Sequence, residues 1–344
     1  MQKLAVSTCA LVAVMLAAVG AQTPATSPDE QYLFIDTLSE YSKWTRTFNF
    51  QKIGERLEDA GNRGFALQWL ARRSPSVNMI LKRDGQGPRS YRFIAEGKEG
   101  SFLKELNQAG SQGFRLLPDA IRVLEQQYQT TWVAVMAKHA EAAPFTYSVV
   151  KGVEEGQRAL ADAAASGRAL KGILARPGMT TANTLLFFED AGAAKALPVA
   201  PGQSEFRIIT TTRTSTLEKE LAQAAAERFR LVGTSTGYMT TVMARNARST
   251  DGPVEYRVLA MMRIKTGVDE LAAAGAEGFR IAAPAENGQE GVYILQRTPG
   301  KSEKSEHRTL MLEETTADRL LREAEAEGYR IVALLNDLVV LERP

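Results

Sequence analysis

Arginine is the polar residue whose recurrence in this sequence could support chemistry. One set of arginines lies in short runs of β-branched and aromatic residues, and a second set lies two residues beyond a recurring, usually glycine, position. Guanidinium groups repeated across a sheet can bind carboxylate, phosphate or sulfate groups. They can also pair with Glu or Asp of a neighbouring strand and cover apolar surface, which is the favoured interpretation because a repeat copies such pairs automatically. The candidate ligand-binding residues are Arg92, Arg115, Arg207, Arg230, Arg257, Arg280, Arg308 and Arg330.

A second feature with chemical potential is a G-x-S-x-G match from Gly233 to Gly237, which would make Ser235 a nucleophile. A nucleophile elbow needs a strand before the serine and a helix after it. The residues that follow, Tyr238 to Ala244, are typical of a strand instead, so the match is predicted to lie in a β-hairpin turn. The only bases that a triad could use are His139 and His307. A serine hydrolase using Ser235 is therefore only a remote alternative.

Metal and nucleotide sites find little support. Neither histidine belongs to a metal-binding spacing, and the single cysteine, Cys9, lies near the N-terminus. Glu323, Glu325 and Glu327 would spread around a helix, which favours a solvated surface over a calcium site. Neither a Walker A motif nor G-x-G-x-x-G occurs. We expect no catalytic residue, no metal and no cofactor.

These residues are carried by a unit of roughly fifty residues that recurs six times. Each unit has a leucine, an alanine three residues later, usually a glycine four residues after that, and commonly an aromatic residue next. Leucine and alanine at this spacing share one helix face, and the glycine suits the left-handed residue that ends a helix. Arg228 breaks the rule and should cost about 1 kcal/mol if its backbone is left-handed. The three positions are Leu57, Ala60, Gly64; Leu106, Ala109, Gly113; Leu160, Ala163, Gly167; Leu221, Ala224, Arg228; Leu271, Ala274, Gly278; and Leu321, Ala324, Gly328.

The remaining pattern of each unit predicts a β-α-β-β order. A strand such as Tyr256–Leu259 precedes the helix, a second such as Tyr329–Val332 follows the glycine, and a third such as Leu338–Leu341 ends the unit. In the first unit the opening strand is either Tyr32–Ile35, which we prefer, or a segment nearer Tyr41–Thr47. The fold class is therefore α+β, with about six tandem repeats, mainly antiparallel sheets and helices on one face.

Sheets of this size are marginal alone, and their second face is half apolar. We therefore expect neighbouring units to pair, either by extending the sheet or by covering it. Glycine and proline mark the boundaries between units, and the longest such stretch is expected to be the hinge between two halves of three units each. The expected divisions are a signal peptide at 1–21, a flexible lead-in at 22–30, repeats at 31–84, 89–139, 145–190, 205–247, 254–298 and 306–344, and a linker at 191–204.

The N-terminus is typical of an export signal. Lys3 precedes an apolar run from Leu4 to Val19, and small residues up to Ala21 offer a cleavage point. The alternatives are a membrane anchor, for which the run is short, and a lipoprotein centred on Cys9. The favoured interpretation is that the protein is exported, either to the periplasm or by secretion, and that its source is bacterial. The formal net charge of +2 gives no reason to expect nucleic acid as a partner, and signal cleavage would leave no membrane span.

The segment from Leu106 to Phe114, LNQAGSQGF, and the segment from Ala276 to Phe279 resemble a pattern of short uncharacterised DUF-type β-α-β-β domains. That pattern opens with a tyrosine-containing strand and continues through Leu-Asn and Gly-x-x-Gly-Trp, with Phe here in place of Trp. The resemblance covers about fifty residues at a time, and the units with Gly167 and Arg228 depart from it most. It implies the fold alone, with no catalytic residue and no ligand.

The leading hypothesis from sequence is a non-catalytic exported repeat protein that binds a protein or a cell-envelope partner. Binding is expected on the hairpin loops, which differ most between units; the segment from Pro118 to Thr131 is long, whereas Asn336–Asp337 is short. The alternative is a receptor for an anionic small molecule or polymer that uses the arginines.

Overall fold

The computed structural model covers residues 1–344, and a compact unit is formed by Gln31–Pro344. The structure describes residues 30–42, 47–73, 76–126, 129–138, 143–175, 184–190, 204–235, 239–246, 252–261, 264–287, 290–300, 304–335 and 338–344. The predicted signal peptide and His139 lie outside these ranges. In the described residues, no helix is both long and apolar enough to cross a membrane.

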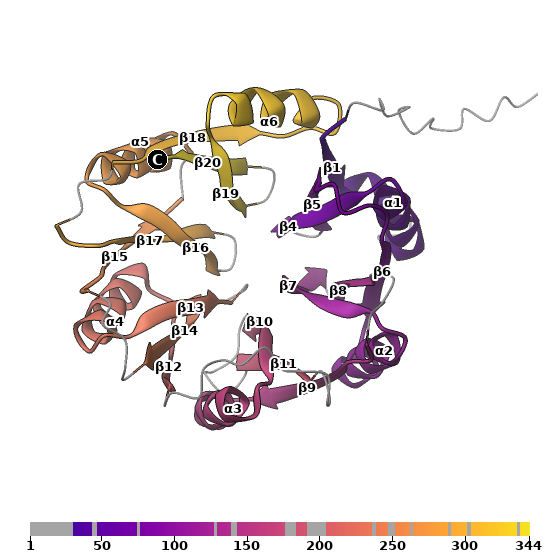
Figure 1. Ribbon diagram of the computed structural model, residues 1–344, viewed down its shortest axis with the longest axis horizontal. Coiled ribbons are helices and arrows are strands. Elements are labelled where there is room, and N and C mark those ends of the chain that lie inside the picture. The colour runs from indigo at the N-terminus through magenta and orange to yellow at the C-terminus, as the bar shows by residue number, and fades with distance from the viewer. Residues whose placement is uncertain are drawn as a thin grey trace, which may run out of the picture. The chain divides into compact units, whose positions relative to one another are not determined.

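The predicted β-α-β-β plan is confirmed in all six units (Figure 1). The first strands are β1 (Tyr32–Asp36), β6 (Ser90–Glu96), β9 (Thr146–Lys151), β12 (Ser204–Thr211), β15 (Glu255–Ala260) and β18 (Glu306–Met311). The helices are α1 (Phe50–Asn62), α2 (Glu99–Ser111), α3 (Val153–Ser166), α4 (Thr214–Ala226), α5 (Ile264–Ala276) and α6 (Ala317–Ala326). The second strands are β4 (Phe65–Arg73), β7 (Arg115–Gln126), β10 (Ala169–Ala175), β13 (Arg230–Thr234), β16 (Arg280–Asn287) and β19 (Arg330–Leu335). The third strands are β5 (Ser76–Arg83), β8 (Gln129–Lys138), β11 (Thr184–Asp190), β14 (Met239–Asn246), β17 (Glu290–Arg297) and β20 (Leu338–Arg343).

Each unit forms a three-stranded antiparallel sheet with its third strand in the middle, as in the order β1-β5-β4. The preferred opening strand of the first unit is confirmed, because β1 pairs with β5 along its whole length. The first unit also carries an insertion between its first strand and its helix. This insertion holds a 3₁₀ turn at Thr37–Glu40 and the short pair β2 (Tyr41–Ser42) and β3 (Thr47–Phe48).

The recurring glycine position ends each helix in the way its spacing predicts. At the end of α5 the Phe279 amide donates to the Ala274 carbonyl oxygen and the Gly278 amide donates to the Gly275 carbonyl oxygen, both at 3.0 Å. These are the two hydrogen bonds of a Schellman ending, and Gly278 has a φ of +86°. Arg228 takes the same left-handed conformation, with a φ of +68°. The chain therefore keeps the turn in the fourth unit without its glycine.

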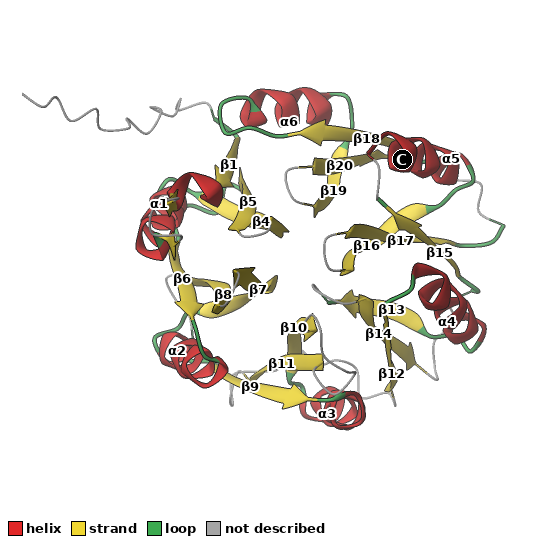
Figure 2. Cartoon of the chain, turned by 180° about the vertical axis from the view of Figure 1, so that it is seen from behind, coloured by secondary structure: helices red, strands yellow, loops and turns green. Residues whose placement is uncertain are grey.

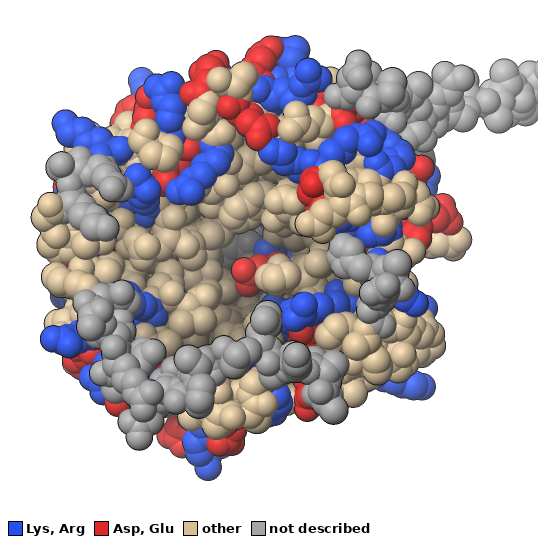
Figure 3. Space-filling model, viewed as in Figure 1, with Lys and Arg blue, Asp and Glu red and all other residues tan. Residues whose placement is uncertain are grey.

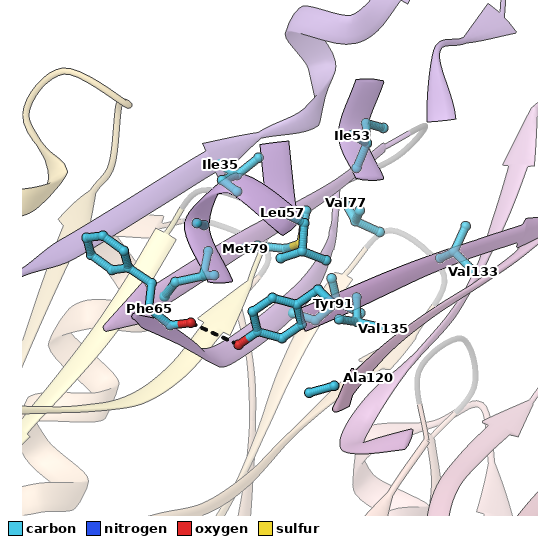
Figure 4. Close-up of a cluster of buried hydrophobic side chains, with 14 of the residues drawn as sticks. Ile35, Ile53, Leu57, Phe65, Val77, Met79, Tyr91, Ala120, Val133 and Val135 are labelled. Carbon is cyan, nitrogen blue, oxygen red and sulfur yellow. Dashed lines mark hydrogen bonds between the residues drawn. The ribbon is translucent and has the colours of Figure 1, made fainter. Parts of the chain in front are cut away.

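The hydrophobic cores lie between successive sheets, so each is shared by two units. The core around Leu57 on α1 combines Val77 and Met79 of the first sheet with Val133 and Val135 of the second (Figure 4). On β5 the neighbouring residue Ile80 points to the opposite core. Because side chains alternate along a strand, each third strand supplies two cores, and this is why its residues are mostly apolar and are buried in an unbroken run. The prediction that neighbouring units cover the second sheet face is confirmed.

The units follow one another around a central axis and the sixth packs on the first (Figures 1 and 2). Helix α6 contacts β1, and a core joins Tyr32 and Phe34 to Leu321 and Val339. At this closing junction the amides of Gln31 and Tyr32 both donate to Asp318 Oδ1 at 2.8 Å. Helix α3 of the third unit likewise packs on β12 of the fourth unit, although residues 191–203 separate the two units in sequence. The compact unit is therefore a closed ring of six β-α-β-β units.

At several junctions, a tyrosine of the first strand forms a hydrogen bond with the preceding unit. The Leu67 amide donates to the Tyr91 hydroxyl at 2.7 Å, and this hydroxyl donates to the Phe65 carbonyl oxygen at 3.1 Å (Figure 4). Leu67 stands beside the bulge where β4 shifts register against β5. A bulge leaves backbone groups outside the strand ladder, and the tyrosine satisfies one of them. Tyr147 and Tyr256 bind Leu116 and Leu231 at the equivalent places, at 2.7 and 2.9 Å.

The second unit departs from the predicted hairpin. The sequence predicts a long hairpin loop from Pro118 to Thr131, yet β7 continues to Gln126 and β8 begins at Gln129. The extra residues instead form an enlarged bulge, because Leu116 pairs with Met136 and Ile121 pairs with Ala134. Four residues, 117–120, therefore stand opposite one residue of β8. Pro118 and Asp119 are typical turn residues, and here they bend a strand rather than end it.

Candidate functional site

The second strands of all six units surround a cavity of about 320 Å³ at the ring axis. Each unit contributes lining residues at its bulge or just after it, such as Trp69, Ile121, Ile173, Val232, Pro284 and Leu334. Figure 3 shows the face of the molecule hollowed at its centre, with mostly uncharged atoms around a few acidic and basic ones. The volume lies at the lower end of the range for small-molecule sites. This axial cavity is the candidate site.

Among the described residues, Asp119 and Arg122 are the only charged residues that line the axial cavity. Both belong to the second unit, at or beside the enlarged bulge of β7. Asp119 is exposed to the cavity and has a left-handed backbone, with a φ of +51°. A non-glycine residue in this conformation is uncommon, although Asp tolerates it better than most. The bulge therefore introduces a carboxylate at a position where the other five units have none.

Arg122 holds the enlarged bulge in place. Its guanidinium donates to three backbone carbonyl oxygens, those of Asp119, Ile121 and Leu70, the bond to Ile121 being 2.7 Å long. Leu70 belongs to β4 of the first unit, so the arginine also joins two units. Its side chain is buried. No hydrogen bond to the Asp119 carboxylate is formed in the described part of the chain, which leaves its oxygens facing the cavity.

The electrostatic environment of Asp119 is set by these surroundings. Protein surrounds the carboxyl group on the cavity wall, and this burial raises its pKa, while the positive charge of Arg122 acts in the opposite direction. The net result is a pKa above the ordinary value of an aspartic acid. Asp119 is nevertheless exposed within the cavity and accessible to a small molecule there.

The first-strand arginines do not line the axial cavity. Arg257 donates to both carboxylate oxygens of Glu277, at 3.2 and 2.6 Å, and its guanidinium lies 4.3 Å from the centre of the Phe279 ring. The pair lowers the pKa of Glu277 through the hydrogen bonds from Arg257. The equivalent contacts are Arg207 with Glu227 at 3.2 Å, Arg308 with Glu327 at 3.1 Å, and Arg92 with the Gln112 side chain at 2.8 Å.

Third-strand arginines, which the sequence did not single out, cover the same aromatic rings. Arg297 lies 4.5 Å from the centre of the Phe279 ring, while Arg245 and Arg83 lie 4.9 and 4.5 Å from Phe229 and Phe65. The aromatic residue after the glycine is therefore held by cation–π contacts, and these are packing contacts within a unit. These arginines could have been found from their recurrence near the ends of the third strands, at Arg83, Arg245, Arg297 and Arg343.

The arginines two residues after the glycine position have partners both in neighbouring units and in their own unit. Arg115 contacts Glu189 of the next unit at 2.9 Å, and Arg330 contacts Glu342 at 2.7 Å. Arg280 of the fifth unit lies 4.0 Å from Glu342 of the sixth. Arg230 donates to the carbonyl oxygens of Phe229 and Gly252. All eight arginines thus have partners within the chain, and anion binding by any of them stays a prediction.

Ser235 directly follows β13 and is buried. The Thr240 amide donates to its hydroxyl oxygen at 3.2 Å, and its own amide donates to the Thr240 carbonyl oxygen at 2.7 Å. His307 lies in the sixth unit, where its ring is 3.5 Å from Glu342. In the ranges that the structure describes, no group of three His, Cys, Asp or Glu side chains is arranged to hold a metal ion.

Asp119 and Arg122 are the cavity residues that sequence reasoning missed. Their signal is the extra length of the second unit between Phe114 and its third strand, which was interpreted as a hairpin loop. Comparison with known protein families, with curated proteins and with solved structures finds no match. The resemblance to short DUF-type domains stays a prediction.

Proposed function

We propose that the chain is a non-catalytic binding protein whose axial cavity takes a small ligand. One observation carries this proposal: the enlarged bulge of β7 places the accessible carboxylate of Asp119 in a cavity whose only other charged residue in the described lining, Arg122, is bound to backbone carbonyl oxygens. A left-handed aspartate with a raised pKa costs stability, and such costs are typical of functional positions. The first-strand arginines, in contrast, are engaged in repeated contacts inside each unit.

The proposed setting is outside the cytoplasm, because residues 1–21 are typical of an export signal. A larger protein or cell-envelope partner would use the turns of the six β-hairpins, most of which lie outside the described residues. The described residues favour the axial cavity as the site.

The experiment compares the binding of a small-molecule library to the wild-type chain and to a variant with a filled cavity. Val232 lines the cavity and is 52% exposed, so Val232→Trp extends a large side chain into open space. Met311 is 51% exposed on β18 and is not part of the cavity lining, which makes Met311→Trp the matched control. Thermal-shift hits should survive in Met311→Trp and disappear in Val232→Trp. Hits that persist in both variants would contradict the proposal.

A further inference from the structure

We infer that the axial cavity binds a small organic cation, an amine or ammonium group on an apolar body. This inference rests on the proposed function and adds the charge of the ligand. It follows from the different tasks of the two charged residues that line the cavity, and from the character of the walls around them.

The negative charge of the cavity is available to a ligand. The carboxylate of Asp119 is exposed inside the cavity and accepts no hydrogen bond from the described residues. It is the only negative charge among the described lining residues, and no donor among them holds it in place. An ammonium group would provide both the donors and the opposite charge at this point.

The positive charge is directed to the protein instead. The Arg122 guanidinium donates to the carbonyl oxygens of Asp119, Ile121 and Leu70, and its side chain is buried behind the bulge. An anionic ligand would have to compete with these three backbone acceptors and would also face Asp119. The cavity therefore selects against anions even though its two charged residues have opposite signs.

The walls suit the body of an organic cation rather than a hydrated metal ion. Trp69, the aromatic residue of the lining, offers a ring to which an ammonium group can be attracted. Val232, Pro284 and Leu334 contribute apolar surface on the other sides. The volume of about 320 Å³ equals the space of roughly ten water molecules at about 30 Å³ each, which limits the ligand to a small molecule.

The test uses three probes of nearly the same shape and different charge: benzylammonium, benzyl alcohol and benzoate. Isothermal titration calorimetry measures their dissociation constants for the wild-type chain at neutral pH. We expect benzylammonium to bind at least tenfold more tightly than benzyl alcohol, and benzoate to bind most weakly. Asp119→Asn, which keeps the shape and tolerates the left-handed backbone, should bring benzylammonium to the value for the alcohol.

The matched control is Glu323→Gln, which removes the same charge from an exposed position on α6 and leaves the cavity untouched. It should leave all three dissociation constants unchanged. Three probes that bind equally, and are all lost in Val232→Trp, would overturn the inference about charge and leave the proposed cavity function intact. Benzoate binding most tightly would also overturn it. No binding by any of the three probes would overturn the cation inference, and the library screen above then decides the proposed function separately.

Discussion

The left-handed residue after each helix shows how far a single position is constrained by the fold. Five units place glycine there, and Arg228 reaches the same region with a φ of +68°. The Cβ atom of an L-residue is crowded in this conformation, whereas glycine has none.

Replacing Arg228 with glycine should therefore stabilise the protein by about 1 kcal/mol, and Gly278→Val should destabilise it by about 1–2 kcal/mol. Chemical denaturation of the two variants measures both effects. An unchanged unfolding free energy in Gly278→Val would contradict the assignment of the helix end.

At Asp119, the ionised carboxylate that would bind a cation lowers the stability of the folded protein. Its pKa is raised above the ordinary value of 3.8, mainly by burial, so the folded state binds a proton more readily than the unfolded state does. Its ionised form therefore costs stability at neutral pH. That cost falls as the pH drops through the folded-state pKa and is gone below the unfolded-state value.

Asp119→Asn should accordingly raise the melting temperature at pH 7, and the gain should vanish as the pH approaches 3.8. Arg122 is the charged group that faces it across the bulge. Calorimetric scans of both proteins from pH 7 down to pH 4 measure the difference. A variant less stable than wild type at pH 7 would show that the carboxylate is a structural partner.

The arginines illustrate what the sequence reveals about an element and what it does not. Their recurrence predicted pairs across strands or units, and Arg257 with Glu277 and Arg115 with Glu189 are such pairs. The enlarged bulge of β7 was not predictable, because Pro118 and Asp119 favour a turn locally and only the pairing of Leu116 and Ile121 with β8 keeps them in a strand. Tertiary pairing decided the conformation of this segment.

The junction between β18 and β20 depends on the buried carboxylate of Glu342. Burial alone would raise its pKa, but the neighbouring His307 and Arg330 hold the pKa below the ordinary value of 4.5. A lowered folded-state pKa means that this contribution is present above pH 4.5 and is lost as the pH falls through the folded-state value.

Glu342→Gln should cost about 2 kcal/mol at pH 7, because a buried charged hydrogen-bond acceptor is lost. Its control is Glu327→Gln on the exposed Arg308 pair, which should cost less than about 0.5 kcal/mol. Urea unfolding at pH 7 and at pH 3 distinguishes the two variants, since the loss of unfolding free energy caused by Glu342→Gln should be smaller at pH 3. Equal costs in both variants would contradict a buried role.

At the scale of the whole molecule, each core belongs to two units, so the ring is the folding unit. The sequence predicted six β-α-β-β copies, and the half-apolar second face of their sheets indicated that neighbouring units pair by extending the sheet or by covering that face. The closure of the sixth unit on the first has no local signal. It depends on a contact between residues nearly three hundred positions apart, such as Tyr32 and Asp318.

Two adjacent residues of β1 test this closure. Phe34 is 1% exposed and packs in the core that it shares with α6, whereas Ile35, also 1% exposed, packs in the core around α1. Phe34→Ala should cost about 3–5 kcal/mol and Ile35→Ala about 2–5 kcal/mol. Amide hydrogen exchange in α6 should be faster than in wild type for Phe34→Ala and unchanged for Ile35→Ala. Unchanged exchange in α6 would contradict a closed ring.

The central claim is that six units close into a ring whose axial cavity binds a small cation beside Asp119. The most direct measurement is a crystal structure of the chain at saturating benzylammonium. The account predicts a closed ring, with the probe between Trp69 and Asp119 and its nitrogen within hydrogen-bond distance of the carboxylate. An open arrangement of units, or an empty axial cavity with the probe bound elsewhere, would contradict it.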